Sequence, residues 1–228
     1  MSDTLPTLAV IGGTGALGGG LAVRWAGSGY PVVIGSRSSE KAVRAAQEIN
    51  LGNNAHPVHG TDNKSAAEQG DIVIITVPFS SHSAILGEIS SVVGGKIVID
   101  ATVPLMPPKV GTVQLPTAGS AALLTQEALG ENVDVVAAFH NVAADKLRSL
   151  DRIDCDVLVC GNKKSARQAA IKLVEGLGMR GLHAGPIANS AAAEALTSVL
   201  ITINRLYKVD GAGIRITGDL TAPEFDNV

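Results

Sequence analysis

The sequence predicts an α/β protein, a doubly wound, mostly parallel sheet with a small C-terminal α/β extension. Short apolar runs alternate with helical stretches along the 228 residues, which is typical of a parallel sheet covered on both faces. The first run passes directly into a glycine-rich turn, and no internal repeat or low-complexity linker interrupts the alternation. A composition change near residues 145–154 predicts a core of residues 1–145 and an extension of residues 146–228.

Each apolar run is bounded by residues that favour its ending as a strand. The first ends in glycines, the second ends at Gly35, and the fourth is stopped by Pro78. The fifth leads toward Pro104 and the sixth precedes His140, whereas the third, near residues 57–59, is weak. The predicted strands are residues 8–11, 32–34, 57–59, 72–77, 96–99, 133–138, 156–160 and 180–183.

The stretches between the runs are predicted to be helices, at residues 17–28, 39–49, 64–69, 83–93, 120–129, 164–176 and 188–207. The last carries apolar residues at i, i+3, i+4 spacing, namely Leu196, Val199, Leu200, Ile203 and Leu206. We expect this face to pack on the protein's own core, with a dimer contact as the alternative. Residues 104–117 contain four prolines and are predicted to be a surface loop near the site.

The turn after the first strand predicts a dinucleotide site. Gly13-Thr14-Gly15-Ala16-Leu17-Gly18 matches the G-x-G-x-x-G fingerprint that holds a pyrophosphate between a strand and a helix. Gly13 is expected to allow the tight turn, Gly15 to leave room for phosphates, and Gly18 to let the helix pack against the strand. The unpaired N–H groups at the start of that helix would face the anion.

The tip of the second strand indicates NADP rather than NAD. An NAD site places Asp or Glu there to bind the ribose 2′-hydroxyl, but this chain has Ser36, Arg37 and, four residues later, Lys41. Arg37 can bind a 2′-phosphate through two charge-assisted hydrogen bonds. The alternative is a solvated basic turn in which Ser39 caps the next helix, a role compatible with phosphate binding.

A second ligand is expected beyond the carboxyl ends of the strands, where open α/β sheets bind their ligands. The segments there are Val77-Pro78, the stretch around Val103, and His140-Asn141. His82 is expected either at a helix entry or in the cleft. The chain lacks a Tyr-x-x-x-Lys pair for moving a hydroxyl proton, so we predict no catalytic acid or base. Hydride exchange between two cofactors requires only close contact and exclusion of water.

Composition excludes several classes of function. The net charge is −3 with no Lys/Arg-rich stripe, and aromatic residues make up only 3%, so we expect no nucleic-acid partner. No apolar run reaches the length of a membrane span, and residues 1–6 do not resemble a signal peptide. Cys155 and Cys160 match no metal or redox spacing, so we expect reduced thiols in a cytoplasmic protein.

Together these segments resemble the NADPH-dependent reductases of the deazaflavin coenzyme F-420. The resemblance extends nearly end to end, through Gly-Ser-Arg-Ser-Ser-Glu-Lys, Ala-Phe-His-Asn-Val, Ala-Gly-Pro-Ile-Ala-Asn-Ser and Asp-Gly-Ala-Gly-Ile-Arg. It implies a Rossmann-type enzyme, usually a homodimer, that passes hydride between NADP(H) and the deazaflavin.

The resemblance also implies roles for individual residues. The pyrophosphate would be held by Thr14, Gly15, Ala16 and Leu17, and the 2′-phosphate by Ser36, Arg37 and Lys41. The nicotinamide would be lined by Val77, Val103 and Ala144. The deazaflavin pocket would lie near His140, Asn141, Ala212 and Gly213.

Two other interpretations stay open at the level of sequence. One is an NADPH-dependent reductase of another acceptor, such as a flavin, ferric iron, or a small imine or ketoacid. The other is a protein that senses NADP without turnover.

Overall fold

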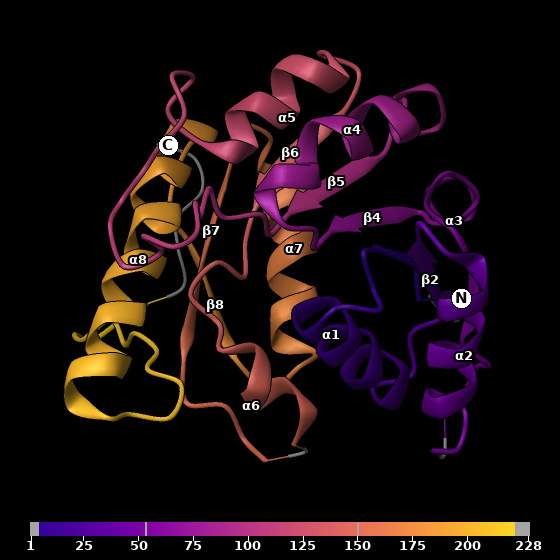
Figure 1. The fold of residues 1–228 in the computed structure, drawn as a ribbon, viewed down its shortest axis with the longest axis horizontal. Helices are drawn as coiled ribbons and strands as arrows, with labels where there is room; N and C mark the ends of the chain where they lie inside the picture. The colour runs from indigo at the N-terminus through magenta and orange to yellow at the C-terminus, as the bar shows by residue number, and fades with distance from the viewer. Residues whose placement is uncertain (1–4, 53, 150, 222–228) are drawn as a thin grey trace.

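The computed structural model describes residues 5–52, 54–149 and 151–221, and its strands form one eight-stranded sheet (Figure 1). Their order across the sheet is β3-β2-β1-β4-β5-β6-β7-β8. Every neighbouring pair is parallel except β6 and β7, which are antiparallel. The strands are β1 (Leu8–Ile11), β2 (Val32–Ser36), β3 (His59–Asp62), β4 (Ile72–Ile75), β5 (Ile97–Asp100), β6 (Asp134–Ala137), β7 (Asp156–Gly161) and β8 (Arg180–His183). The doubly wound, mostly parallel sheet is therefore confirmed.

The helices also follow the predicted order, with two differences. They are α1 (Ala16–Gly27), α2 (Ser39–Ile49), α3 (Asn63–Gln69), α4 (Phe79–Ile89), α5 (Ala121–Leu129), α6 (Ala144–Arg148), α7 (Lys164–Glu175) and α8 (Ser190–Tyr207). Helix α4 begins four residues earlier than expected, because Pro78 occupies its N-cap with a proline-compatible φ of −59°. The five-residue helix α6 was not predicted, because so short a helix has no readable periodicity.

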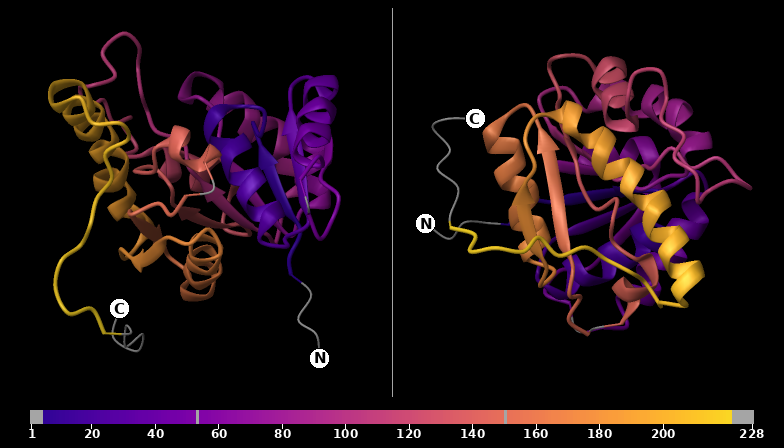
Figure 2. Two further views of the ribbon diagram at one scale, coloured as in Figure 1. Left: turned by 90° about the horizontal axis from the view of Figure 1, so that it is seen from below. Right: turned by 90° about the vertical axis from the view of Figure 1, so that its left-hand side faces the viewer.

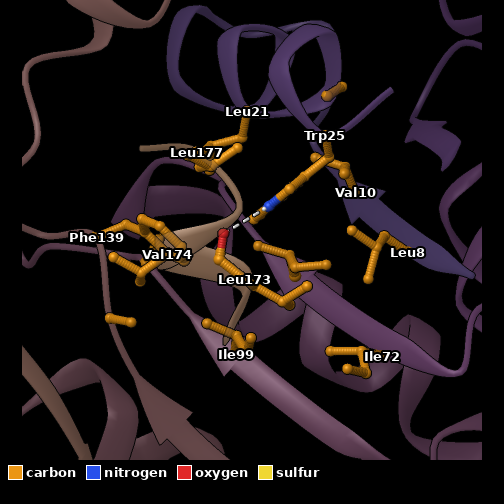
Figure 3. Packing of buried hydrophobic residues seen from close by; sticks show 14 of the residues in the cluster. Leu8, Val10, Leu21, Trp25, Ile72, Ile99, Phe139, Leu173, Val174 and Leu177 are labelled. Carbon is orange, nitrogen blue, oxygen red and sulfur yellow. Dashed lines mark hydrogen bonds between the residues drawn. The ribbon is translucent and has the colours of Figure 1, made fainter. Parts of the chain in front are cut away.

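Alternating side chains of the strands build a core on each face of the sheet. In β1, Leu8 and Val10 belong to one buried cluster, and Ala9 and Ile11 belong to the other. The first cluster continues into α1 and α7, and Figure 3 shows its centre at Trp25. The indole nitrogen of Trp25 donates a hydrogen bond of 3.0 Å to the Leu173 carbonyl, so this buried polar group is satisfied.

The strand order positions the ligand edge of the sheet. From β1 the chain crosses outward to β2 and β3, then returns to the other side of β1 at β4. Crossovers on opposite sides of β1 leave a crevice beyond its carboxyl end, which is where open α/β sheets bind nucleotides. The glycine-rich turn follows β1 at this point.

Helix α8 corrects one expectation about its apolar face. Leu200 is buried, but Val199 is 45% exposed and Leu206 is 70% exposed, so this face does not pack fully on the protein's own core. The right-hand view in Figure 2 shows α8 lying across the outside of the molecule. The prolines of residues 104–117 lie in a segment without helix or strand, as predicted. This segment meets α8 where the Thr202 hydroxyl bonds the Gly111 carbonyl.

Cys155 and Cys160 carry free thiols, as expected, and both are buried. Among the described residues, no helix is long and apolar enough to span a membrane. The predicted boundary between residues 145 and 146 falls inside α6. The outer ends of the two predicted units, residues 1–4 and 222–228, lie outside the described residues.

Candidate functional site

The glycine-rich turn has the shape that the fingerprint predicts, but the residue that makes the tight turn is Gly12 and not Gly13. The positive φ of +77° falls on Gly12, not on Gly13. Gly13 is required for another reason, because a Cβ there would lie 2.9 Å from both the Val10 carbonyl oxygen and the Ile34 side chain. A Cβ on Gly18 would lie 2.3 Å from the Thr76 hydroxyl oxygen, so this glycine does let α1 approach β4.

The start of α1 is open for an anion. Gly15 is its N-cap, and no side chain caps the helix there. A Cβ on Gly15 would meet only the Gly12 carbonyl oxygen, at 3.3 Å, so the space beside it is free. Ala16 and Leu17 are the first two residues of the helix, whose backbone N–H groups have no partner within the helix. This arrangement fits a pyrophosphate.

A pocket of about 360 Å³ brings most of the predicted nucleotide residues together. It is lined by Thr14, Gly15, Ser36, Arg37, Lys41, Val77 and Pro78. These residues come from the ends of β1, β2 and β4 and from the first turn of α2. The pocket therefore joins the glycine turn to the basic tip of β2 along the ligand edge of the sheet.

The basic tip of β2 presents two cations without acidic partners. Arg37 and Lys41 are exposed, and neither takes part in an ion pair within the described residues. The cap of α2 is Ser38 rather than the expected Ser39, since the Ser38 hydroxyl accepts the Lys41 N–H at 3.3 Å. The Ser36 hydroxyl in turn accepts the Ser38 N–H at 3.3 Å. Both cationic side chains are thus left available for an anionic ligand.

A second pocket, of about 480 Å³, collects three of the predicted deazaflavin residues: Asn141, Ala212 and Gly213. The segment after α8 forms one wall, and the N–H of Ala212 donates to the side-chain oxygen of Asn204 at 2.7 Å. A Cβ on Gly213 would lie 2.9 Å from the sulfur of Cys155. The Asn141 amide donates to the Asp156 carbonyl at 2.6 Å, which holds it in the floor.

His140 is buried, and both its ring nitrogens lack a hydrogen-bond partner within the described residues. Burial lowers the pKa of His140 to about 4, so the ring is neutral near pH 7. The preceding residue, Phe139, has a φ of 71°, which is uncommon for a side chain of this size. Edge-to-face packing on Trp25, at 5.7 Å between ring centroids, holds Phe139 in this conformation.

Two predicted nicotinamide residues lie apart from these two pockets. Val103 is half-buried just beyond β5, and Ala144 is half-buried at the first position of α6. Neither lines the pocket of Arg37 or the pocket of Asn141. The structure therefore groups seven predicted residues at the first pocket and three at the second.

Sequence reasoning missed the buried polar groups behind these pockets. His82 lies in the first turn of α4, as one of the two expectations has it, but its side chain is not in the cleft, because it is 2% exposed and bonded to Asp100. Glu194 of α8 is fully buried, where its carboxylate accepts the N–H groups of Ala121 and Ala122. Burial raises the pKa of Glu194 to about 8. The only available signal was an acidic residue, Asp100, at the end of an otherwise apolar run.

Comparison with known proteins shows which protein family this chain is similar to. A family model described as "NADP oxidoreductase coenzyme F420-dependent" matches residues 7–104. The F420-dependent NADP reductase of Methanocaldococcus jannaschii is 38% identical over 92% of this chain and 97% of its own length. That of Methanothermobacter thermautotrophicus is 39% identical over 92% of this chain and 94% of its own length.

A solved structure agrees in fold. The crystal structure of a protein described as a candidate F420-dependent NADP reductase from Arthrobacter sp. FB24 superposes with a TM-score of 0.76. It is 25% identical, and the match covers 94% of this chain and 99% of that one. The identity along almost the whole length of two relatives, together with the Rossmann-type sheet, places this chain in the family of F420-dependent NADP reductases.

Proposed function

We propose that this protein is an NADP-dependent oxidoreductase that transfers hydride between NADPH and the deazaflavin coenzyme F-420. One structural observation supports the part of this proposal that concerns binding of NADP. The open start of α1 and the unpaired Arg37 and Lys41 face the same pocket. Membership in the reductase family supports the deazaflavin half.

The residues of the first pocket fit the parts of NADP. Backbone N–H groups at Ala16 and Leu17 would hold the pyrophosphate beside Thr14 and Gly15, since the helix presents its positive end there. Ser36, Arg37 and Lys41 would hold the 2′-phosphate, which an acidic residue at this position would repel. Val77 and Pro78 would cover the nicotinamide, with Val103 and Ala144 completing its surroundings.

The chemistry belongs to the two carriers, and the protein's part is to hold them together. Bound nicotinamide supplies or accepts a hydride without a protein proton relay. Apolar residues such as Val77 would exclude water and bring the two reacting carbons to about 3–3.5 Å. No catalytic acid or base is assigned to this reaction.

We place the deazaflavin at the second pocket. Support comes from Asn141, Ala212 and Gly213, which line a space large enough for a planar ring system. His140 lies next to Asn141 in the chain, and in this proposal its buried, neutral ring lies behind the pocket. In this proposal residues 1–145 bind the dinucleotide, and residues 146–228 complete the cleft.

We also propose a homodimer formed through the outer face of α8. Val199 and Leu206 are exposed there, and Met106, Val113 and Leu115 are exposed on residues 104–117. A second copy of this chain would remove this apolar surface from water.

A cytoplasmic location is proposed from the two buried free thiols, which suit a reducing compartment.

One assay tests the proposed reaction. Purified protein is mixed with NADPH and oxidised coenzyme F-420, and the visible absorbance band of the deazaflavin is followed. The band is expected to bleach at the rate of NADPH oxidation. Reduction of FMN or riboflavin but not of the deazaflavin would overturn the acceptor, and tight NADPH binding without reduction of any acceptor would overturn the enzyme. Family membership does not favour either alternative.

A further inference from the structure

Three buried polar side chains from three separate elements meet behind the nucleotide pocket. His82 comes from α4, Asp100 is the last residue of β5, and Thr125 lies in α5. They are 2%, 0% and 0% exposed. The Nε2 atom of His82 lies 2.8 Å from an Asp100 carboxylate oxygen, and the Thr125 hydroxyl lies 2.5 Å from that same oxygen. The hydroxyl is also 2.9 Å from His82 Nε2, which closes a triangle.

The hydrogen bonds among His82, Asp100 and Thr125 determine which of their atoms carry protons. Burial raises the pKa of Asp100, but hydrogen bonds from His82, Thr125 and the Thr102 N–H outweigh burial and leave the pKa below its ordinary value. A carboxylate can only accept hydrogen bonds, so His82 carries its proton on Nε2 and Thr125 donates its hydroxyl proton. Charge-assisted hydrogen bonds of this kind are about twice as strong as neutral ones. The three elements are thus joined by a strong buried contact.

The contact connects the Val77-Pro78 turn at the nucleotide pocket with the segment that leaves β5 toward Val103. His82 lies in the first turn of α4, and Ser81 beside it and the preceding Val77-Pro78 turn line the nucleotide pocket. The other Asp100 oxygen accepts the Thr102 N–H at 2.8 Å, which fixes the chain where it leaves β5 toward Val103. The segments of Val77 and of Val103 are therefore both tied to one carboxylate.

We propose that Asp100, His82 and Thr125 are positioning residues that set the separation between the Val77-Pro78 turn and the Val103 segment, and so hold the nicotinamide in its reactive position. This proposal rests on the function proposed above, which places the nicotinamide between those segments. The three residues touch neither ligand in this scheme. They act through the backbone, and hydride transfer is sensitive to errors in distance of about 1 Å.

Two substitutions of Thr125 test the proposal. Thr125→Val keeps the shape and removes the hydroxyl, whereas Thr125→Ser keeps the hydroxyl. Single-turnover hydride transfer from NADPH to the deazaflavin is measured by stopped flow, and the Kd for NADPH is measured by fluorescence titration. Thr125→Val is expected to slow transfer about tenfold with less than about a twofold change in Kd. Thr125→Ser is expected to retain nearly the parent rate.

Ile89→Val is the matched control, because Ile89 is buried in α4 but takes no part in this contact. It is expected to lower the melting temperature without slowing transfer. Equal slowing by Thr125→Val and Thr125→Ser would overturn the proposal. So would slowing by Ile89→Val as large as that by Thr125→Val, since the contact would then serve stability alone.

A fluorescence measurement that needs no hydride acceptor distinguishes this proposal from the proposed function. The emission of bound NADPH reports the surroundings of the nicotinamide. Thr125→Val is expected to shift this emission toward that of free NADPH, while Thr125→Ser keeps the parent emission. Failure of the parent protein to reduce the deazaflavin would overturn the function alone. Unchanged emission in Thr125→Val would overturn the positioning role, whichever acceptor the protein uses.

Discussion

In the proposed function, Arg37 is the residue on which the choice between NADP and NAD depends most. Its guanidinium is exposed beside the pocket and has no ion pair within the described residues. A structural arginine is normally satisfied by carbonyls or carboxylates, as Arg24 is by the carbonyls of Lys146 and Asp151. The contrast between these two arginines supports the proposal that Arg37 binds an external anion.

Arg37→Ala is expected to weaken NADPH binding roughly ten- to a hundred-fold and to leave NADH binding nearly unchanged. The reason is that losing one charge-assisted hydrogen-bond partner costs about 1.5–3 kcal/mol. Fluorescence titration with both nucleotides measures the two Kd values. Arg44→Ala, on the following helix α2 and also exposed, is the control and is expected to change neither. Equal losses for NADPH and NADH would remove Arg37 from the phosphate site.

A second prediction at the residue scale concerns His140 and the dependence of the free energy of unfolding on pH. Its pKa is about 4 in the folded protein and about 6.5 when unfolded. Between these values the unfolded chain binds the extra proton, so the free energy of unfolding falls as the pH drops from about 6.5 toward 4. His140→Leu removes this dependence. Relative to the parent, it is expected to gain about 2 kcal/mol between pH 7 and pH 5.

Urea unfolding of the parent and of His140→Leu at several pH values measures this difference. Taking the difference between the two free energies of unfolding removes the contribution of carboxylates that titrate in both proteins. A constant difference between the two proteins across this range would show that His140 is not buried as a neutral ring.

At the scale of elements, α1 depends on glycine for its closeness to the sheet. A Cβ at Gly18 would lie 2.9 Å from the Gly12 carbonyl oxygen as well as against the Thr76 hydroxyl, which itself bonds the Ile11 carbonyl at 2.8 Å. The first turn of α1 is therefore held against the ends of both β1 and β4. Its N–H groups can face the pocket only while this packing persists.

Gly18→Ala is expected to destabilise the protein by about 1–3 kcal/mol, because the methyl group overpacks a rigid junction. It should also weaken NADPH binding as the helix start moves. Gly27→Ala is a matched control at the end of the same helix, where a Cβ would meet nothing within 4 Å. That change is expected to stabilise by about 0.4–1 kcal/mol. Denaturant unfolding measures both, and equal stabilities for the two variants would contradict the packing argument.

At the scale of the whole molecule, the proposed homodimer places a second copy of this chain over the exposed face of α8. Val199→Asp combined with Leu206→Asp places charges on its exposed apolar face. If this face is the dimer contact, sedimentation velocity should show a dimeric parent and a monomeric variant. Leu51→Asp should stay dimeric, because Leu51 is 89% exposed and closely follows α2, which lies on the other side of the molecule from α8 (Figure 1). A monomeric parent would overturn the homodimer.

Much of the fold could be predicted because its signals are local. Strand β1 and helix α2 have the predicted bounds, since an apolar run ended by glycines and an amphipathic stretch each depend on adjacent residues. The positions of Gly15 and Arg37 at one pocket could be predicted for the same reason, because a fingerprint places them directly after strands, and their role in binding a nucleotide stays a prediction. Helix α6 and the exposure of Leu206 were not, because they depend on what packs nearby.

The sequence by itself determined the alternation of strands and helices, the glycine turn and the cationic tip of β2, because each is encoded within a few consecutive residues. Only the tertiary structure decided that His82, Asp100 and Thr125 meet, and that His140 is buried with no partner for its ring nitrogens among the described residues. His82 and Thr125 are 43 residues apart in the chain. Contacts over such separations are set by how the sheet stacks its helices, and no local pattern of residues records them.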